Sequence, residues 1–235
     1  MAAKQIKTAV YTGTRNLYPD MIPAVKSLLI NSDVDRVYLL IEDDAFPEYL
    51  PKCVKTINVS RQRYFQPYGA NSKSEYTYMA LMRAALSKVF PRLDRILSLD
   101  VDTIVDRDIS ELWTVPLRDQ YYFAGVMEPM KSRYGQTYTN IGVVVFNLRK
   151  MRKDKKTDEV IDLLNTDEMP YPEQDALNYL CQGGIFPLDG MYNYNPWVVR
   201  PTEQPKIYHF AAQKNWNINN PIVDKYKNIP WEEIR

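Results

Sequence analysis

The fold is decided by the segment Arg95–Val105, which has the sequence RILSLDVDTIV. It begins as an apolar run and ends on two carboxylates, Asp100 and Asp102, two positions apart. Alternate side chains of a strand share a face, so these carboxylates are expected to point the same way. Because adjacent carboxylates repel each other, we expect a hard divalent cation, Mg²⁺ or Mn²⁺, to bridge them to substrate phosphates. The segment therefore predicts a nucleotide-dependent transfer enzyme.

An Asp-x-Asp pattern also occurs in solvated turns and in calcium loops. Most such patterns are solvated turns, but this pair follows an apolar run of the kind that forms a buried strand. A calcium loop would take Asp100, Asp102 and Glu111 as its first, third and twelfth ligand positions. That loop also needs an oxygen ligand and then a glycine, where this chain has Ile104 and Val105. Since α/β sheets bind ligands at strand ends, the divalent-metal interpretation is favoured.

Apolar runs alternate with helical patterns along the whole chain. Strands are predicted over residues 8–12, 36–41, 55–59, 96–99, 121–126 and 142–146. Helices are predicted over 20–31, with Pro23 in its first turn, and over 74–90, 157–165 and 174–181. Irregular loops are expected over 61–73 and 192–205. This alternation predicts an α/β fold with a largely parallel sheet flanked by helices.

Composition excludes several classes of protein. The 235 residues are 45% hydrophobic and carry a formal net charge of +1. We therefore expect one globular domain over residues 1–235, and no nucleic-acid partner. The basic run 149–156 is typical of a solvated face, with an anionic membrane or a substrate as the alternative partner. No transmembrane segment or signal peptide is predicted, so the chain is expected to be cytoplasmic.

The chain contains a single histidine, His209, at the end of an apolar run. A lone histidine is usually a structural residue, but Lys214 and Trp216 follow closely here. Imidazole is a softer ligand than carboxylate, so a site with two carboxylates and one imidazole suits Mn²⁺ better than Mg²⁺. A nearby ammonium group would neutralise a departing pyrophosphate. The expected metal ligands are Asp100, Asp102 and His209.

The segments 99–105 (LDVDTIV) and 108–113 (DISELW) resemble the metal-binding signature of glycosyltransferase family eight. That family includes glycogenin and the bacterial lipooligosaccharide galactosyltransferases. The resemblance implies a GT-A fold, with a nucleotide-binding part over about 1–110 and a sugar and acceptor part over about 111–235. It also implies Mn²⁺-dependent, retaining transfer of a hexose from UDP-glucose or UDP-galactose. The resemblance leaves two points open: whether the acceptor is a carbohydrate, a lipid-linked acceptor or a protein, and whether the chain forms a homo-oligomer.

The same resemblance implies roles for individual residues. The segment 207–216 is similar to a motif in which the histidine, here His209, completes the metal site and the lysine, Lys214, holds the diphosphate. Arg83 matches an arginine that is aimed at the donor, and Asn140 matches an asparagine that contacts the sugar. The other residues that it implies at the donor or near the reacting carbon are Thr12, Thr14, Asn16, Tyr18, Val101, Glu128, Glu173, Gln174 and Asp175.

Two groups of these residues have more specific implied roles. The loop after the first strand, from Thr12 to Tyr18, is expected to bind uracil, with the tyrosine stacked on the base. The helix start at 173–178 (EQDALN) is expected to bring Gln174 and Asp175 nearest to the anomeric carbon. At Glu128 and Glu173 the family has aspartates. We hypothesise that the longer Glu128, alone or with Glu173, sets the donor choice and favours UDP-glucose mildly.

The sequence leaves alternatives open for the chemical step and for the class of function. The transition state should be oxocarbenium-like. Gln174 is a poor nucleophile, so either the acceptor attacks from the leaving-group face, or Asp175 or Glu173 traps the sugar. A sugar-phosphate nucleotidyltransferase is the second function, because the segment 13–15 (GTR) resembles its phosphate loop, although the preceding glycines are absent. A non-catalytic carbohydrate-binding module is the third.

Overall fold

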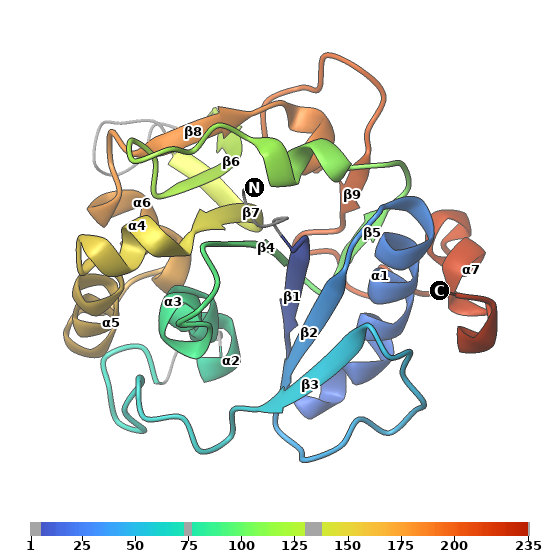
Figure 1. Cartoon of the computed structure of the whole chain (residues 1–235), viewed down its shortest axis with the longest axis horizontal. Coiled ribbons are helices and arrows are strands. Elements are labelled where there is room, and N and C mark those ends of the chain that lie inside the picture. The colour runs from blue at the N-terminus through green and yellow to red at the C-terminus, as the bar shows by residue number, and fades with distance from the viewer. Residues whose placement is uncertain (1–5, 73–76, 130–137, 235) are drawn as a thin grey trace, which may run out of the picture.

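The computed structural model describes residues 6–72, 77–129 and 138–234 of the chain. Its centre is a seven-stranded sheet with the order β3-β2-β1-β4-β7-β6-β8 (Figure 1). One half is parallel and consists of β1 (Thr8–Thr12), β2 (Arg36–Ile41), β3 (Val54–Asn58) and β4 (Arg95–Leu99). The other half consists of β6 (Phe123–Glu128), β7 (Tyr138–Asn147) and β8 (Ile185–Leu188). Among these described strands only β7 is antiparallel to its sheet neighbours, which confirms the predicted mixed, largely parallel sheet.

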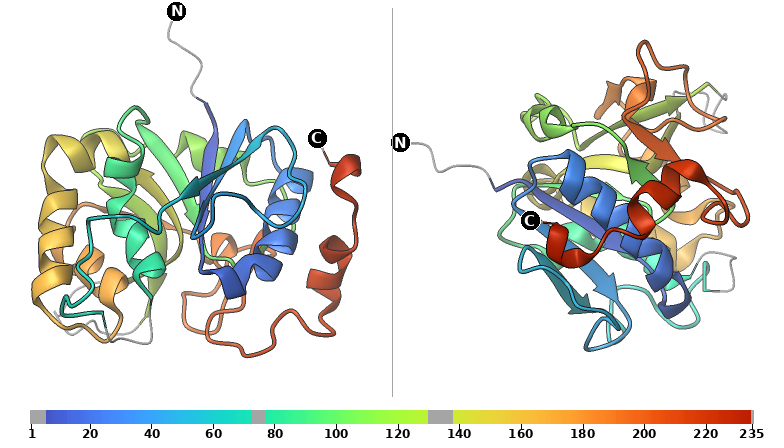
Figure 2. Two further views of the ribbon diagram at one scale, coloured as in Figure 1. Left: turned by 90° about the horizontal axis from the view of Figure 1, so that it is seen from below. Right: turned by 90° about the vertical axis from the view of Figure 1, so that its right-hand side faces the viewer.

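Helices cover both faces of the sheet, and each face has its own hydrophobic core. α1 (Tyr18–Asn31) lies on one face, and α7 (Pro221–Lys227) lies beside it (Figure 2). The opposite face is covered by α2 (Tyr78–Leu81), the 3₁₀ turn η2 (Met82–Ala85), α3 (Leu86–Val89), α4 (Leu148–Lys153), α5 (Lys156–Thr166) and α6 (Pro172–Leu180). Because both faces are covered, the central strands are nearly continuous apolar runs. No helix in the described residues is long and apolar enough to cross a membrane.

A second, two-stranded sheet brings distant parts of the chain together. β5 (Thr103–Val105) follows β4 after a short turn and pairs antiparallel with β9 (Ile207–His209). The pairing places His209 opposite Thr103, directly beside the Asp100–Asp102 turn. Four 3₁₀ turns complete the described part of the chain, η1 (Arg15–Leu17), η3 (Ser110–Thr114), η4 (Gly190–Tyr192) and η5 (Trp231–Glu233).

Two of the predicted helices differ from the structure. The helix predicted over 74–90 is wrong as a continuous element, because α2 gives way to the 3₁₀ turn η2 before α3 begins; residues 74–76 lie outside the described residues. That turn carries Arg83, whose side chain is buried toward the sheet. The first helix begins at Tyr18, two residues before the predicted start. Pro19 fits its first turn because backbone N–H groups there have no acceptor within the helix, so the missing N–H of proline costs no hydrogen bond. Pro23 therefore lies inside the helix and not in its first turn.

Candidate active site

A cavity of about 530 Å³ opens beyond the carboxyl end of β4. It lies where the two halves of the sheet meet, because its walls come from the β4–β5 turn, β6, β7, α6 and β9. Most of the polar side chains predicted from the sequence line it: Arg83, Asp100, Asp102, Glu128, Asn140, Glu173, Gln174, Asp175 and His209. The structure therefore brings residues from positions 83 to 209 into one cavity.

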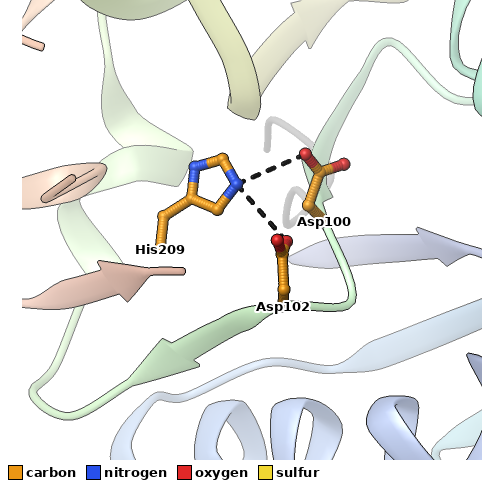
Figure 3. A group of neighbouring side chains, drawn as sticks. All are labelled: Asp100, Asp102 and His209. Carbon is orange, nitrogen blue, oxygen red and sulfur yellow. Dashed lines mark ion pairs between the residues drawn. The ribbon is translucent and has the colours of Figure 1, made fainter. Parts of the chain in front are cut away.

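Three of these side chains form a candidate metal site (Figure 3). His209 Nε2 lies 3.3 Å from Asp102 Oδ1 and 3.6 Å from Asp100 Oδ2. The carboxylates converge as predicted, but the predicted cause, two alternate positions on one face of a strand, was wrong. β4 ends at Leu99, and a turn held by the Thr103 hydroxyl and the Asp100 carbonyl, 2.6 Å apart, aims both carboxylates inward. Two carboxylates and one imidazole are a ligand set that suits Mn²⁺.

The position of His209 depends on a glycine in the neighbouring sheet. The pairing of β6 with β7 shifts register between Gly125 and Val126, which leaves residues 141–143 as a bulge relative to β6. Bulges commonly re-aim the backbone beside active sites. Here the bulge carries Gly142, and the imidazole lies against its Cα. A Cβ at Gly142 would lie 2.2 Å from His209 Cε1, so only glycine leaves room for the ring.

Arg83 is the buried cation of the site, with 4% of its surface exposed. Its guanidinium donates to the Ile141 carbonyl at 2.8 Å and forms an ion pair with Asp100. Burial lowers the pKa of Arg83, while the charges of Glu173 and Asp102 oppose that shift. Among the described residues its Nε has no hydrogen-bond partner, although it is buried. A buried donor without a partner is costly, so this nitrogen is suited to receive an acceptor atom from a ligand.

Glu128, Asn140 and Gln174 form the polar wall opposite the carboxylate turn. Asn140 Nδ2 donates to Glu128 Oε1 at 2.8 Å, and Gln174 Oε1 accepts from the Ile141 backbone N–H at 3.1 Å. Burial raises the pKa of Glu128, and hydrogen bonds from Asn140 and Gln174 oppose the rise. This wall therefore offers a mixture of donors and acceptors to a hydroxylated ligand.

The two acidic neighbours of Gln174 differ in their surroundings. Both oxygens of Asp175 accept hydrogen bonds, from the Tyr138 hydroxyl at 2.5 Å and from the Tyr171 backbone N–H at 3.0 Å. Glu173 is buried, and burial raises its pKa while the charge of Arg83 opposes the rise. The acidic residues thus hold the start of α6 and balance the buried guanidinium.

Six predicted residues lie outside the lining of the cavity. The loop that follows β1 begins beside the carboxylate turn, because Tyr11 pairs with Leu99. Its Thr14 hydroxyl donates to Asn16 Oδ1 at 2.6 Å. Lys214 is exposed, although Ala211 and Ala212 of the same segment line the cavity. The six are Thr12, Thr14, Asn16, Tyr18, Val101 and Lys214.

The stacking role predicted for Tyr18 does not fit this geometry. Only 4% of the residue is exposed, and its ring packs against Phe46 with the centroids 5.2 Å apart. Its hydroxyl donates to Asp43 Oδ2 at 3.0 Å and accepts from the Glu42 backbone N–H at 2.9 Å. Tyr18 therefore anchors the start of α1 to the end of β2 and offers little ring surface to a base.

Sequence reasoning missed four residues at or behind the cavity. Tyr138, Tyr171 and Trp197 line it, and the last two are 54% and 51% exposed. Asn193 is fully buried behind the metal site, with Oδ1 2.7 Å from His209 Nδ1. Two of them, Asn193 and Trp197, lie in the segment 192–197 (YNYNPW). Its concentration of asparagine and aromatic residues could have indicated a site, but the sequence predicted only an irregular loop there.

The fold agrees with what the comparisons with known proteins show. The family model of glycosyl transferase family 8 matches residues 21–219, and the chain belongs to this family. The galactosyltransferase LgtC, solved in complex with donor and acceptor sugar analogues, has a similar structure, with a TM-score of 0.71. The two chains are 16% identical, and the match covers 96% of this chain and 98% of LgtC. The fold is therefore that of a GT-A glycosyltransferase.

Two curated bacterial proteins are related in sequence. Glycosyltransferase GlyA of Streptococcus pneumoniae is 26% identical, in a match that covers 96% of this chain and 34% of GlyA. A lipopolysaccharide 1,2-glucosyltransferase of Escherichia coli is 30% identical, over 61% of this chain and 52% of that protein. The chain thus spans about a third to a half of the length of these two relatives.

The first prediction concerns the carboxylate turn. Asp102→Asn removes a charged ligand, so we expect kcat/KM to fall on the order of 10²-fold through lost electrostatic stabilisation. Asp119→Asn, at an exposed ion pair with Arg149 outside the cavity lining, is the matched control and should leave turnover unchanged. Initial rates with saturating Mn²⁺ provide the measurement. Near-normal turnover of Asp102→Asn would show that Asp102 is not a ligand.

The second prediction concerns the glycine beneath the imidazole. Gly142→Ala places a methyl group inside van der Waals contact with three atoms of the His209 ring. We expect the ring to move and Mn²⁺ affinity, measured by titration without donor, to fall about 10- to 100-fold. The control is Gly183→Ala, whose backbone φ of +71° makes alanine mildly destabilising away from the site. Equal Mn²⁺ affinities of the two variants would contradict the prediction.

Proposed function

We propose that this chain is a retaining hexosyltransferase that moves glucose or galactose from a UDP-sugar to an acceptor with Mn²⁺, or Mg²⁺ in its place. The observation that carries the proposal is the convergence of Asp100, Asp102 and His209 with the buried cation Arg83 in one cavity. When bound, the metal would supply Lewis-acid stabilisation to the leaving diphosphate. A neutral sugar-binding protein has no need of such a cluster, which argues against a non-catalytic module.

The donor side of the cavity supports a diphosphate-linked sugar. Arg83 already neutralises one oxygen of Asp100, and its unpartnered Nε is a donor for a phosphate or sugar oxygen. Glu128, Asn140 and Gln174 would then hold the sugar hydroxyls. We propose that Lys214, exposed without ligand, turns inward when the diphosphate binds, since Ala212 and Asn215 near it hold left-handed backbone conformations.

The nucleoside end of the donor is proposed to lie against the loop that follows β1. Thr12, Thr14 and Asn16 are proposed to contact uracil or ribose, and Val101 to pack beside them near Gly13. Tyr18 acts there by anchoring the loop and not by stacking. On this proposal the nucleotide-binding part covers about 1–110 and the sugar and acceptor part about 111–235.

For the chemical step we favour attack by the acceptor from the leaving-group face. A trapped glycosyl intermediate on Asp175 would require that carboxylate to give up its hydrogen bonds from Tyr138 and Tyr171. Glu173 is buried, and burial raises its pKa because it favours the neutral acid, which is not a nucleophile. Gln174 would instead stabilise the oxocarbenium-like sugar through its amide oxygen.

The acceptor would enter beside the exposed aromatic residues of the cavity mouth. Tyr171 and Trp197 offer ring faces large enough to stack on the apolar face of a sugar. A carbohydrate, a lipid-linked sugar or a glycosylated protein would each present such a face.

The experiment that tests the function is an assay of released UDP. UDP-glucose and UDP-galactose are each supplied with Mn²⁺, with Mg²⁺ and with a chelator, and products are identified by mass. A hexosyltransferase releases UDP in the presence of metal and adds one hexose to an acceptor. Synthesis of UDP-sugar with release of pyrophosphate would instead establish a nucleotidyltransferase, and sugar binding without turnover would establish a binding module.

The third prediction concerns donor choice. Glu128→Asp draws the carboxylate back by one methylene, so the 2.8 Å hydrogen bond from Asn140 should lengthen or break. We expect the ratio of kcat/KM for UDP-glucose to that for UDP-galactose to change about 5-fold, the equivalent of one hydrogen bond of about 1 kcal/mol. Glu159→Asp, on the exposed side of α5, is the control. An unchanged ratio would mean that Glu128 does not select the donor.

A further inference from the structure

A chain of buried hydrogen bonds runs from the sugar side of the cavity to the metal-binding imidazole. Asn140 Nδ2 donates to Glu128 Oε1, and Asn140 Oδ1 accepts from Asn193 Nδ2, each at 2.8 Å. Asn193 Oδ1 then lies 2.7 Å from His209 Nδ1. Asn193 is fully buried and does not line the cavity, so any effect it has on the reaction is exerted through its two neighbours.

Donor and acceptor roles along this chain are set by a backbone group. The Gly142 N–H donates to Asn140 Oδ1 at 3.0 Å, and a backbone N–H has no other role. The oxygen of the Asn140 amide must therefore face Gly142, where it also accepts from Asn193. It follows that Asn193 presents its nitrogen to Asn140 and its oxygen to His209. An amide oxygen only accepts, so Nδ1 of the imidazole must carry a proton.

A second backbone group independently supports the same orientation of the Asn193 amide. The Trp197 N–H donates to Asn195 Oδ1 at 2.9 Å, which turns the Asn195 amide nitrogen toward Asn193. That nitrogen lies 3.0 Å from the Asn193 carbonyl oxygen, 3.3 Å from Asn193 Oδ1 and 3.5 Å from His209 Nδ1. The contact of Nδ1 with Asn193 Oδ1 is much shorter, at 2.7 Å, so it decides the role of Nδ1. If the Asn193 amide were reversed, two nitrogen donors would face each other here, and two oxygens would face each other at Asn140. The reversed arrangement is therefore excluded from both sides.

The geometry points to Asn193 as a positioning residue that holds His209 in the Nδ1–H tautomer and aims its Nε2 lone pair at the metal position. Nε2 faces Asp102 Oδ1 at 3.3 Å and Asp100 Oδ2 at 3.6 Å, which is where a shared cation would lie. Partners of this kind on the second nitrogen of a ligand histidine typically change metal affinity 10- to 100-fold. The inference rests on the metal role proposed for His209, and its test separates the two.

The tautomer is measured directly, because His209 is the only histidine in the chain. A long-range ¹H–¹⁵N correlation spectrum of the metal-free protein, recorded at alkaline pH, shows a single imidazole without ambiguity. We expect the proton on Nδ1 in the unaltered protein and a mixture of tautomers in Asn193→Ala. A proton on Nε2 in the unaltered protein, or the same spectrum in Asn193→Ala, would overturn the inference.

Metal affinity provides the second readout, by Mn²⁺ titration without donor. We expect Asn193→Ala to bind Mn²⁺ about 10- to 100-fold more weakly. The matched control is Asn71→Ala, which removes a buried asparagine with three hydrogen bonds to backbone groups of residues that do not line the cavity.

The outcomes distinguish the inference from the proposed function. A structural role for Asn193 would lower the melting temperature of Asn193→Ala and Asn71→Ala alike and leave Mn²⁺ affinity unchanged in both, which would overturn the inference. Wild-type affinity in Asn193→Ala would also overturn it. If the unaltered protein binds no Mn²⁺, the proposed metal role fails, and the tautomer spectrum alone decides the assignment of Asn193.

Discussion

The repulsion between two carboxylates at the end of β4 is the constraint on which the rest of the site depends. Asp100 and Asp102 are aimed into one cavity by a tight turn, and they can stay there only if positive charge lies close by. The fold meets this need in two ways, with a buried cation and with a neutral ligand that would help to hold a metal ion. A 3₁₀ turn buries Arg83 against Asp100, and the β5–β9 pairing holds the imidazole of His209 beside both carboxylates. Burial raises the pKa of Asp102, but the neighbouring His209 side chain and the Arg83 charge hold it below its ordinary value.

Local sequence was sufficient for the inner strands of the parallel half of the sheet because they are largely buried, whereas the partly exposed edge strand β8 was not predicted. The strands at 8–12 and 36–41 were predicted to the residue, since each is an apolar run with polar residues close to both ends. The break in the helix at 82–85 could not be predicted in this way. Its cause is tertiary, because the Arg83 side chain reaches Ile141 and Asp100, and no periodicity of the sequence encodes such contacts.

The candidate site likewise contains residues that local sequence predicted and residues whose roles depend on tertiary contacts. Asp100, Asp102 and His209, which converge in the cavity, were predicted as a group from their chemical type and their family motifs. Tyr18 was misjudged because a tyrosine in a ligand-side loop and a tyrosine that anchors a helix have the same local sequence; only the contacts with Asp43 and Phe46 distinguish them. Asn193 was missed because an asparagine in an irregular segment has no local feature that predicts the orientation of its amide.

The pairing of β5 with β9 has a consequence for the order in which this protein assembles. The ligand atoms of Asp102 and His209 are separated by 209 − 102 = 107 residues along the chain, yet their strands are adjacent. Closing a loop of this length costs chain entropy before the β5–β9 contacts form, so we expect this pairing to follow the more local strand pairings of the sheet. Everything up to His209 must therefore leave the ribosome before the three ligands can meet. A nascent chain shorter than this can form its parallel strands, but it has no competent site.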